Sequence, residues 1–329
     1  MMNNNLRFNV TLLLLMSLMV FACSSGKDRF VKRGMEQEKL LNYSLAQQEY
    51  QKSWAKRQKE FSARGLASSS FKMRNFEAAE SWFRQLDNMG KLKKGDYVPY
   101  IQAKIANARF EEAETMFQRY LTLLEEEQKA NQQTVNLGKS IQNGKNLVNT
   151  LSSAQVVPVG GINTEFAEFA FQVNSEGAVL FSTDRFEGRP GAINRKNAFR
   201  SERYGWTGNA FLRVMTGSLD TAENKVSAIQ SVDDLAHPYH IGPVSEGEKY
   251  IFFSKTQENR KAKGFSLRKR FITVQPELFY REVGEDGSLG PVKRFAFNDA
   301  LKHAVTDPFW HELRKRFTSL LIWLVVKVD

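Results

Sequence analysis

The sequence predicts a multidomain α + β protein, with an α-helical solenoid in the first half and an all-β domain in the second. The chain has 329 residues, 42% hydrophobic and 25% charged, which is typical of a globular protein of about two domains. Up to Leu151, aromatic and small residues recur at helical spacing. After Leu151, short aromatic and β-branched runs alternate with Gly, Pro, Ser and Asn, which favours strands and turns.

Residues 1–22 are typical of a secretory signal peptide, because Arg7 precedes a largely apolar run from Val10 to Ala22. A run of this length is too short to span a bilayer, which needs about 20 residues. The chain has one cysteine, Cys23, directly after this run. A single cysteine excludes an intrachain disulfide and a zinc site with several thiolates.

The residues around Cys23, Val-Phe-Ala-Cys-Ser-Ser-Gly, resemble a bacterial lipobox. The resemblance implies that Cys23 is acylated and becomes the mature N-terminus, and two or three acyl chains would anchor the protein stably in a membrane. Serine after the cysteine resembles the outer-membrane sorting pattern of Gram-negative lipoproteins, with the periplasmic or surface face left open. An ordinary signal peptide with an incidental cysteine is the alternative.

Three triplets, each of two aromatic residues and one alanine, recur in the first half at intervals of 33 and 34 residues. The spacing i, i+3, i+7 within a triplet places its side chains on one face of a helix. We expect the alanine to let paired helices approach closely while the aromatic rings fill the space around it. The triplets are Tyr43, Ala46 and Tyr50; Phe76, Ala79 and Phe83; and Phe110, Ala113 and Phe117.

The segments 75–80 and 109–114, which open the second and third triplets, resemble the start of the second helix of a tetratricopeptide repeat. The resemblance implies tetratricopeptide-like repeats over residues 23–130 that bind a peptide or protein partner. The proline that usually ends such a repeat is absent, and the first helix of the third unit has a weak signal. An aromatic stripe in an ordinary helical bundle is the alternative. Residues 131–158 are expected to form a capping helix and a linker.

Six short runs in the second half predict strands, because each combines aromatic or β-branched residues with flanking turn residues. The pair Asp286-Gly287 predicts a tight hairpin turn. The predicted strands are Ala178–Thr183, Ala210–Met215, Tyr250–Ser254, Phe271–Val274, Leu278–Glu282 and Val292–Phe297.

Two segments about 70 residues apart, Asn174–Arg185 and His240–Ser254, are similar to the WD40-like propeller repeat of bacterial envelope proteins. The resemblance implies an incomplete all-β propeller-like domain over residues 159–306. At most three blades can be counted, whereas closed propellers need four or more. The residues that carry the motif are Ser175, Gly177, Phe181, Ser182, His240, Gly242, Pro243, Gly247, Phe253 and Ser254.

The order of lipobox, helical repeats and propeller repeats resembles a family of Gram-negative envelope lipoproteins. Members of that family usually continue to an OmpA-like peptidoglycan-binding module, and some serve gliding or type IX secretion. Residues 307–329 do not continue the pattern and are expected to be an atypical basic and apolar tail. The sequence is therefore expected to be a truncated member, and the alternative is a genuine short form that ends in a small sheet.

The formal net charge of +11 permits binding to nucleic acid, acidic glycan or anionic lipid. The excess is concentrated in residues 189–203, 255–270 and 312–316, which carry +4, +6 and +2. The first two stretches are expected in loops of the β half, and few aromatic residues lie among their charges to stack on bases. We therefore expect no nucleic-acid partner, and an acidic glycan remains an alternative partner.

Candidates for catalysis or metal binding are few. Asp233, Asp234, His237 and His240 fall close together, but Pro238 breaks the helix that would align the two histidines. No nucleophile elbow, phosphate-binding loop or zinc-protease motif is present in the sequence. The sequence predicts a non-enzymatic scaffold for an envelope protein partner, without cofactor or metal. The alternatives are a glycan- or polyanion-binding lipoprotein that uses the β half, and a non-functional truncated product.

Overall fold

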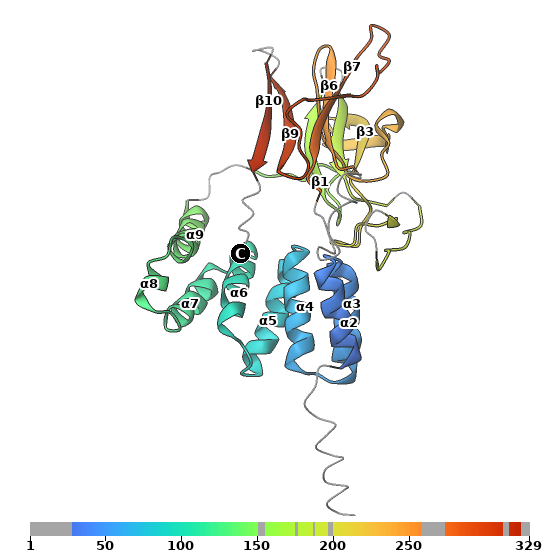
Figure 1. Cartoon of the computed structure of the whole chain (residues 1–329). Helices are drawn as coiled ribbons and strands as arrows, with labels where there is room; N and C mark the ends of the chain where they lie inside the picture. The colour runs from blue at the N-terminus through green and yellow to red at the C-terminus, as the bar shows by residue number, and fades with distance from the viewer. Residues whose placement is uncertain are drawn as a thin grey trace, which may run out of the picture. The chain divides into compact units, whose positions relative to one another are not determined.

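A computed structural model describes residues 28–150, 155–174, 177–186, 188–196, 200–257, 274–311 and 316–323. The expected signal peptide, Cys23, Ser175 and most of the basic stretch 255–270 lie outside these residues. The chain divides into two compact units, Met1–Leu151 and Ser152–Asp329. The first contains paired helices and the second antiparallel sheets (Figure 1), which confirms the α + β order. The described strands form no closed propeller.

The described part of the first unit consists of three helix pairs, a short helix and a longer final helix (Figure 1). Each of the three triplets begins at the first residue of the second helix of a pair. None of the described helices combines the length and apolarity that a membrane crossing requires. The pairs are α2 (Arg29–Lys39) with α3 (Tyr43–Lys56), α4 (Glu60–Lys72) with α5 (Phe76–Asn88), and α6 (Lys94–Ala106) with α7 (Phe110–Leu121), followed by α8 (Glu126–Lys129) and α9 (Gln132–Asn149).

The turn inside each pair has the same backbone geometry. Leu41, Arg74 and Ala108 follow the first helices with φ of +58°, +60° and +56°, in the left-handed region. The next amide donates to the carbonyl five residues back in every case, over 2.9–3.0 Å, as in a Schellman motif. The 33- and 34-residue intervals are therefore a repeat of backbone geometry as well as of sequence, although none of the three turns has the usual glycine.

The alanines of the triplets, Ala46, Ala79 and Ala113, are completely buried. Tyr50, Phe83 and Phe117 are buried with them, as is Tyr43, whereas Phe76 and Phe110 are half-buried. Burial of this order contributes about 1.5–3 kcal/mol per large apolar side chain. The triplets therefore form the core of the stack, as their spacing indicates.

Close approach around Tyr50 depends on two glycines. Its ring lies between Gly34 of α2 and Gly65 of α4, and a Cβ atom built on either glycine would lie 2.5 Å from a ring carbon. Real Cβ atoms do not come this close to neighbouring carbons, so each glycine makes room for one face of the ring.

The first helices of the pairs pack on one another in succession, α2 on α4, α4 on α6 and α6 on α9. The corresponding contacts between α3, α5 and α7 are weaker, so the first helices form the more closely packed layer of a two-layer stack. We call α2, α4, α6 and α9 the first-helix layer. Ile141 of α9 is completely buried while Val135 and Val148 are exposed, so α9 has one buried face.

The second unit contains two four-stranded sheets and one two-stranded sheet among its described residues. All three are antiparallel, and the strands follow chain order within each sheet. The 3-10 helix η2 (Asp233–Leu235) separates the first two sheets. The strands are β1 (Glu168–Val173), β2 (Ala178–Thr183), β3 (Arg213–Asp220) and β4 (Lys225–Ser231); β5 (Ile241–Glu246), β6 (Tyr250–Lys255), β7 (Glu277–Glu282) and β8 (Lys293–Arg294); and β9 (His303–His311) with β10 (Arg316–Trp323).

The strand predictions are confirmed in part. The structure has β2 at its predicted bounds and β6 and β7 close to theirs, and the predicted turn at Asp286-Gly287 lies between β7 and β8. β3 overlaps its predicted range, Ala210–Met215, only at residues 213–215 and continues to Asp220. β8 is shorter than predicted, and most of the strand predicted at 271–274 lies outside the described residues. β1, β4, β5, β9 and β10 were not predicted. Residues 307–311 and 316–323, which fall in the expected atypical tail, belong to the paired strands β9 and β10.

Successive sheets stack in the same way. β5 contacts β1, β2 and β3 of the sheet before it, and β9 contacts β5, β6 and β7 of the sheet before it. Ser254 of β6 links the second and third sheets: its hydroxyl donates to the Gly242 carbonyl of β5 at 2.9 Å, within the second sheet, and lies 3.2 Å from the Thr306 hydroxyl of β9. The second and third sheets therefore each pack against the preceding sheet through their first strand.

Candidate functional site

A groove in the first-helix layer is the candidate site for a protein partner. It lies between α4 and α6, encloses about 360 Å³, and has Phe83 of α5 among its lining residues. Phe71 and Pro99 add apolar surface, and Ser68 and Gln102 add polar groups. A mixed apolar and polar lining of this kind suits the side chains of a bound peptide.

One wall of the groove is fixed by an ion pair. The Arg64 Nε atom lies 3.1 and 3.2 Å from the two carboxylate oxygens of Asp96, and Arg64 also donates to the Lys91 carbonyl. Asp96 in turn accepts a hydrogen bond from the Lys93 amide at the start of α6, at 2.8 Å. These contacts tie α4 to the N-terminus of α6, so the groove between the two helices is preformed.

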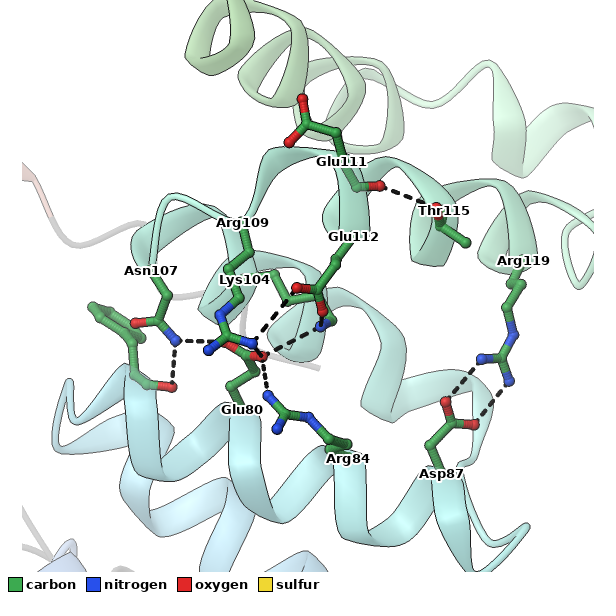
Figure 2. A network of polar contacts seen from close by, with 11 residues as sticks. Glu80, Arg84, Asp87, Lys104, Asn107, Arg109, Glu111, Glu112, Thr115 and Arg119 are labelled. Atoms are coloured by element: carbon green, nitrogen blue, oxygen red, sulfur yellow. Dashed lines mark hydrogen bonds and ion pairs between the residues drawn. The ribbon is translucent and has the colours of Figure 1, made fainter. Parts of the chain in front are cut away.

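A buried polar network lies between the second and third helix pairs (Figure 2). The Glu80 side chain is 2% exposed and the Lys104 side chain 4% exposed, and their charged atoms lie 3.3 Å apart. Lys104 also pairs with Glu112 at 2.6 Å, while Arg109 approaches Glu80 at 3.2 Å. Arg84 is a further partner of Glu80, at 2.5 Å. Three cations therefore compensate one buried carboxylate.

The pKa of Glu80 is set by two opposing effects. Burial alone would raise it, but hydrogen bonds from Asn107 and Arg84 and the charge of Lys104 together hold it below its usual range. Asn107 donates to Glu80 Oε2 at 2.7 Å from the turn between α6 and α7. Glu80 is thus an anion that joins three helices, and its contacts indicate a structural role rather than a reaction. Sequence analysis missed it, although it directly follows the triplet residue Ala79.

A more exposed ion pair joins the second helices of the same two pairs. Arg119 donates two hydrogen bonds of 2.8 Å to the two oxygens of Asp87 (Figure 2). The hydrogen bond from Arg119 outweighs the effect of burial and lowers the pKa of Asp87. This pair is closer to solvent than Glu80 is, with Asp87 25% and Arg119 48% exposed.

The propeller-motif residues occupy equivalent places in the first two sheets. Phe181 and Ser182 of β2 match Phe253 and Ser254 of β6, and all four are buried. Gly177 precedes β2 with φ +81°. The remaining described motif residues belong to β5 or its flanks and are His240, Gly242, Pro243 and Gly247.

His240 has a structural environment. Its Nδ1 atom accepts a hydrogen bond from the Leu212 amide at 3.1 Å, and the rings of Tyr204 and Phe211 pack against it. Burial lowers its pKa to about 4, so the imidazole is neutral at physiological pH. Across the described residues, no group of three or more histidine, cysteine or acidic side chains is arranged to hold a metal ion; this includes Asp233 and Asp234.

The first basic stretch lies in the connection between β2 and β3. Arg203 donates to the Gly208 carbonyl through Nε at 2.6 Å, whereas Arg189, Lys196 and Arg200 are exposed.

The chain matches no family model, no curated protein and no solved structure. Its function is therefore inferred from the residues and the geometry of the two units.

Proposed function

We propose that the chain is a non-enzymatic, lipid-anchored protein of the Gram-negative cell envelope whose helical unit serves as a protein-binding scaffold. The observation that carries the proposal is the preformed groove between α4 and α6 in the first-helix layer. Its walls come from two successive helix pairs, so a bound segment would contact both pairs at once. An extended or helical peptide is the class of ligand that such a groove fits best.

A tetratricopeptide-like solenoid is the architecture we propose for the helical unit. The triplets at intervals of 33 and 34 residues and the identical turns at Leu41, Arg74 and Ala108 support it. Repeat units of this kind contact only their neighbours and create extended binding surfaces along the stack. The polar network at Glu80 would hold two neighbouring units at a fixed angle.

For the β unit we propose an incomplete propeller. Two observations support it. β5 contacts the first three strands of the first sheet, and β9 contacts the first three strands of the second sheet. In both four-stranded sheets the strands follow chain order. Together with the lipobox, this order of parts resembles outer-membrane lipoproteins, some of which serve secretion or gliding complexes. We propose the outer membrane as the location and such a complex as the partner.

The groove is tested by blocking it. The double variant Ser68→Arg/Gln102→Arg places one large cation on α4 and one on α6, inside the groove. We expect it to reduce the amount of partner protein that co-purifies with the full chain at least tenfold, because the added side chains fill the space that a bound segment needs. The measurement is quantitative capture from solubilised envelopes of the bacterium that encodes the chain.

The matched control is Gln118→Arg, which adds the same exposed cation to α7, outside the first-helix layer. Circular dichroism should show the same helical content for all three proteins. Undiminished capture by the double variant would contradict the proposal. If that capture also fell steeply with added salt, the polyanion-binding alternative would be favoured, with Arg189, Lys196 and Arg200 as its candidate residues.

The lipid anchor has its own test at Cys23. The full chain is expected to incorporate labelled palmitate, and Cys23→Ala is expected to incorporate none, because Cys23 is the sole thiol in the sequence. Ser24→Ala, one residue away, should still be labelled. Labelling that persists in Cys23→Ala would refute acylation at this residue.

A further inference from the structure

Each sheet of the β unit begins with a bulged strand. Ala170 of β1, Gly242 of β5 and Asp307 of β9 have φ of +55°, +108° and +51°. The pairing register shifts at each of these places. Bulges re-aim neighbouring side chains and often lie beside functional sites, so three bulges at corresponding places need an explanation.

The three bulges meet at one pocket. Phe169 beside the first bulge, Gly242 and Pro243 at the second, and Thr306 and Asp307 at the third line a cavity of about 340 Å³. This volume is within the range of small-ligand sites. The pocket lies wholly inside the β unit and is independent of the groove between α4 and α6.

The walls of the pocket are largely apolar and are held in place. Leu212 and His240 belong to the wall, and the hydrogen bond from the Leu212 amide to His240 fixes the imidazole ring. His240 is neutral at physiological pH and contributes no charge to the pocket. Since Nδ1 accepts a hydrogen bond, the ring proton lies on Nε2, which is buried and has no hydrogen-bond partner among the described residues. Phe169 and Pro243 supply further apolar surface.

One wall carries a cation that forms no ion pair within the described residues. Lys255, the last residue of β6, is half-buried, and burial lowers its pKa although Glu277 acts in the opposite sense. Its Nζ atom lies 4.5 Å from the centroid of the Phe279 ring. Among the described residues, no carboxylate comes within ion-pairing distance of Lys255. Glu277, the nearby acid, instead accepts from Arg294 and Gln257.

The same pocket carries a carboxylate without a counterion. Asp307 is exposed at the third bulge, and no hydrogen bond or ion pair joins its side chain to any described residue. An ammonium and a carboxylate that share a pocket without pairing with each other present two opposite charges to a ligand. Each of the two charges can form a charge-assisted hydrogen bond with a ligand group of opposite sign.

We propose that this pocket binds a small zwitterion with an apolar side chain, an amino acid or a dipeptide. The ligand carboxylate lies at Lys255, its ammonium group at Asp307, and its side chain against Phe169, Leu212 and Pro243. The two charges select for a zwitterion over a simple anion, which Asp307 would repel. The apolar walls select for an aliphatic or aromatic side chain.

Isothermal titration calorimetry on the full chain tests the proposal, with L-leucine and L-leucyl-L-leucine as probes. At least one of the two should bind, and N-acetyl-leucine amide, which has the same side chain and no charge, should bind at least tenfold more weakly. Lys255→Met and Asp307→Asn should each weaken binding at least tenfold. Asparagine tolerates the left-handed backbone of position 307, so this variant retains the bulge.

Lys293→Met is the control, because Lys293 of β8, whose side chain is 40% exposed, pairs with Glu282 and does not line the pocket. It should bind the probes with wild-type affinity. Near-ultraviolet circular dichroism should give the same spectrum for all variants. Absence of binding for both zwitterions would overturn the proposal, as would equal affinity for the uncharged analogue or unchanged affinity in Lys255→Met.

Discussion

Replacing Glu80 by glutamine is expected to lower the free energy of unfolding of the helical unit by about 3 kcal/mol, because it breaks a buried ion pair on one side only. The shape of the side chain is retained, but the 4%-exposed Lys104 loses one of its two carboxylates. Arg84 and Arg109 lose their contact with the same oxygen. The measurement is urea unfolding of the full chain, followed by circular dichroism at the helical minimum.

Asp87→Asn is the matched control for this prediction. It removes the same charge from an ion pair between the same two helix pairs, but Asp87 is 25% and Arg119 48% exposed. Exposed pairs contribute at most about 1 kcal/mol, so a smaller loss is expected. Equal losses in Glu80→Gln and Asp87→Asn would contradict the view that burial makes the Glu80 network important for stability.

Alanine at Gly65 is expected to destabilise the helical unit by about 2 kcal/mol. The sign is unusual, because alanine in place of a helical glycine ordinarily stabilises a helix by about 1 kcal/mol. At Gly65 the new Cβ would lie 2.5 Å from the Tyr50 ring, and Gly34 holds the opposite face of that ring equally closely. The ring therefore has nowhere to move.

Gly95→Ala is the matched control, and its effect on the free energy of unfolding should have the opposite sign. Gly95 lies in α6, and no atom lies within 4 Å of the position its Cβ would take. It should raise the free energy of unfolding by about 0.5–1 kcal/mol. Thermal unfolding of both variants measures the contrast, and changes in the same direction would show that the packing around Tyr50 is not as tight as the structure indicates.

The helical unit could be predicted well from the sequence because its repeat is local. The spacing of Tyr43, Ala46 and Tyr50 is enough to predict a helical face, and its recurrence predicts the pairs. The left-handed turns at Arg74 and Ala108 could not be predicted, because neither residue favours that conformation and the surrounding helices impose it. Glu80 and Lys104 are 24 residues apart, so their pairing depends on how the helices pack.

The β unit was predicted less completely because its first strands are bulged. In β5 and β9 a residue with positive φ precedes a proline, at Gly242-Pro243 and Asp307-Pro308. Such pairs read as turns or strand ends in a sequence, and the bulge also breaks the alternation of buried and exposed residues. The pocket at Lys255 could not be predicted either, because residues of four strands, β1, β5, β6 and β9, and of the segments between strands come together to form it.

The most direct test of a protein-binding first-helix layer is site-specific photocrosslinking of the full chain inside the cells that naturally express it. A photoreactive residue at Gln102, in the groove, should give a discrete crosslinked adduct with a second protein. The same residue at Gln118, on α7, should give none, because it lies outside the layer. An adduct from Gln118 alone, or none from Gln102, would contradict the proposed scaffold function.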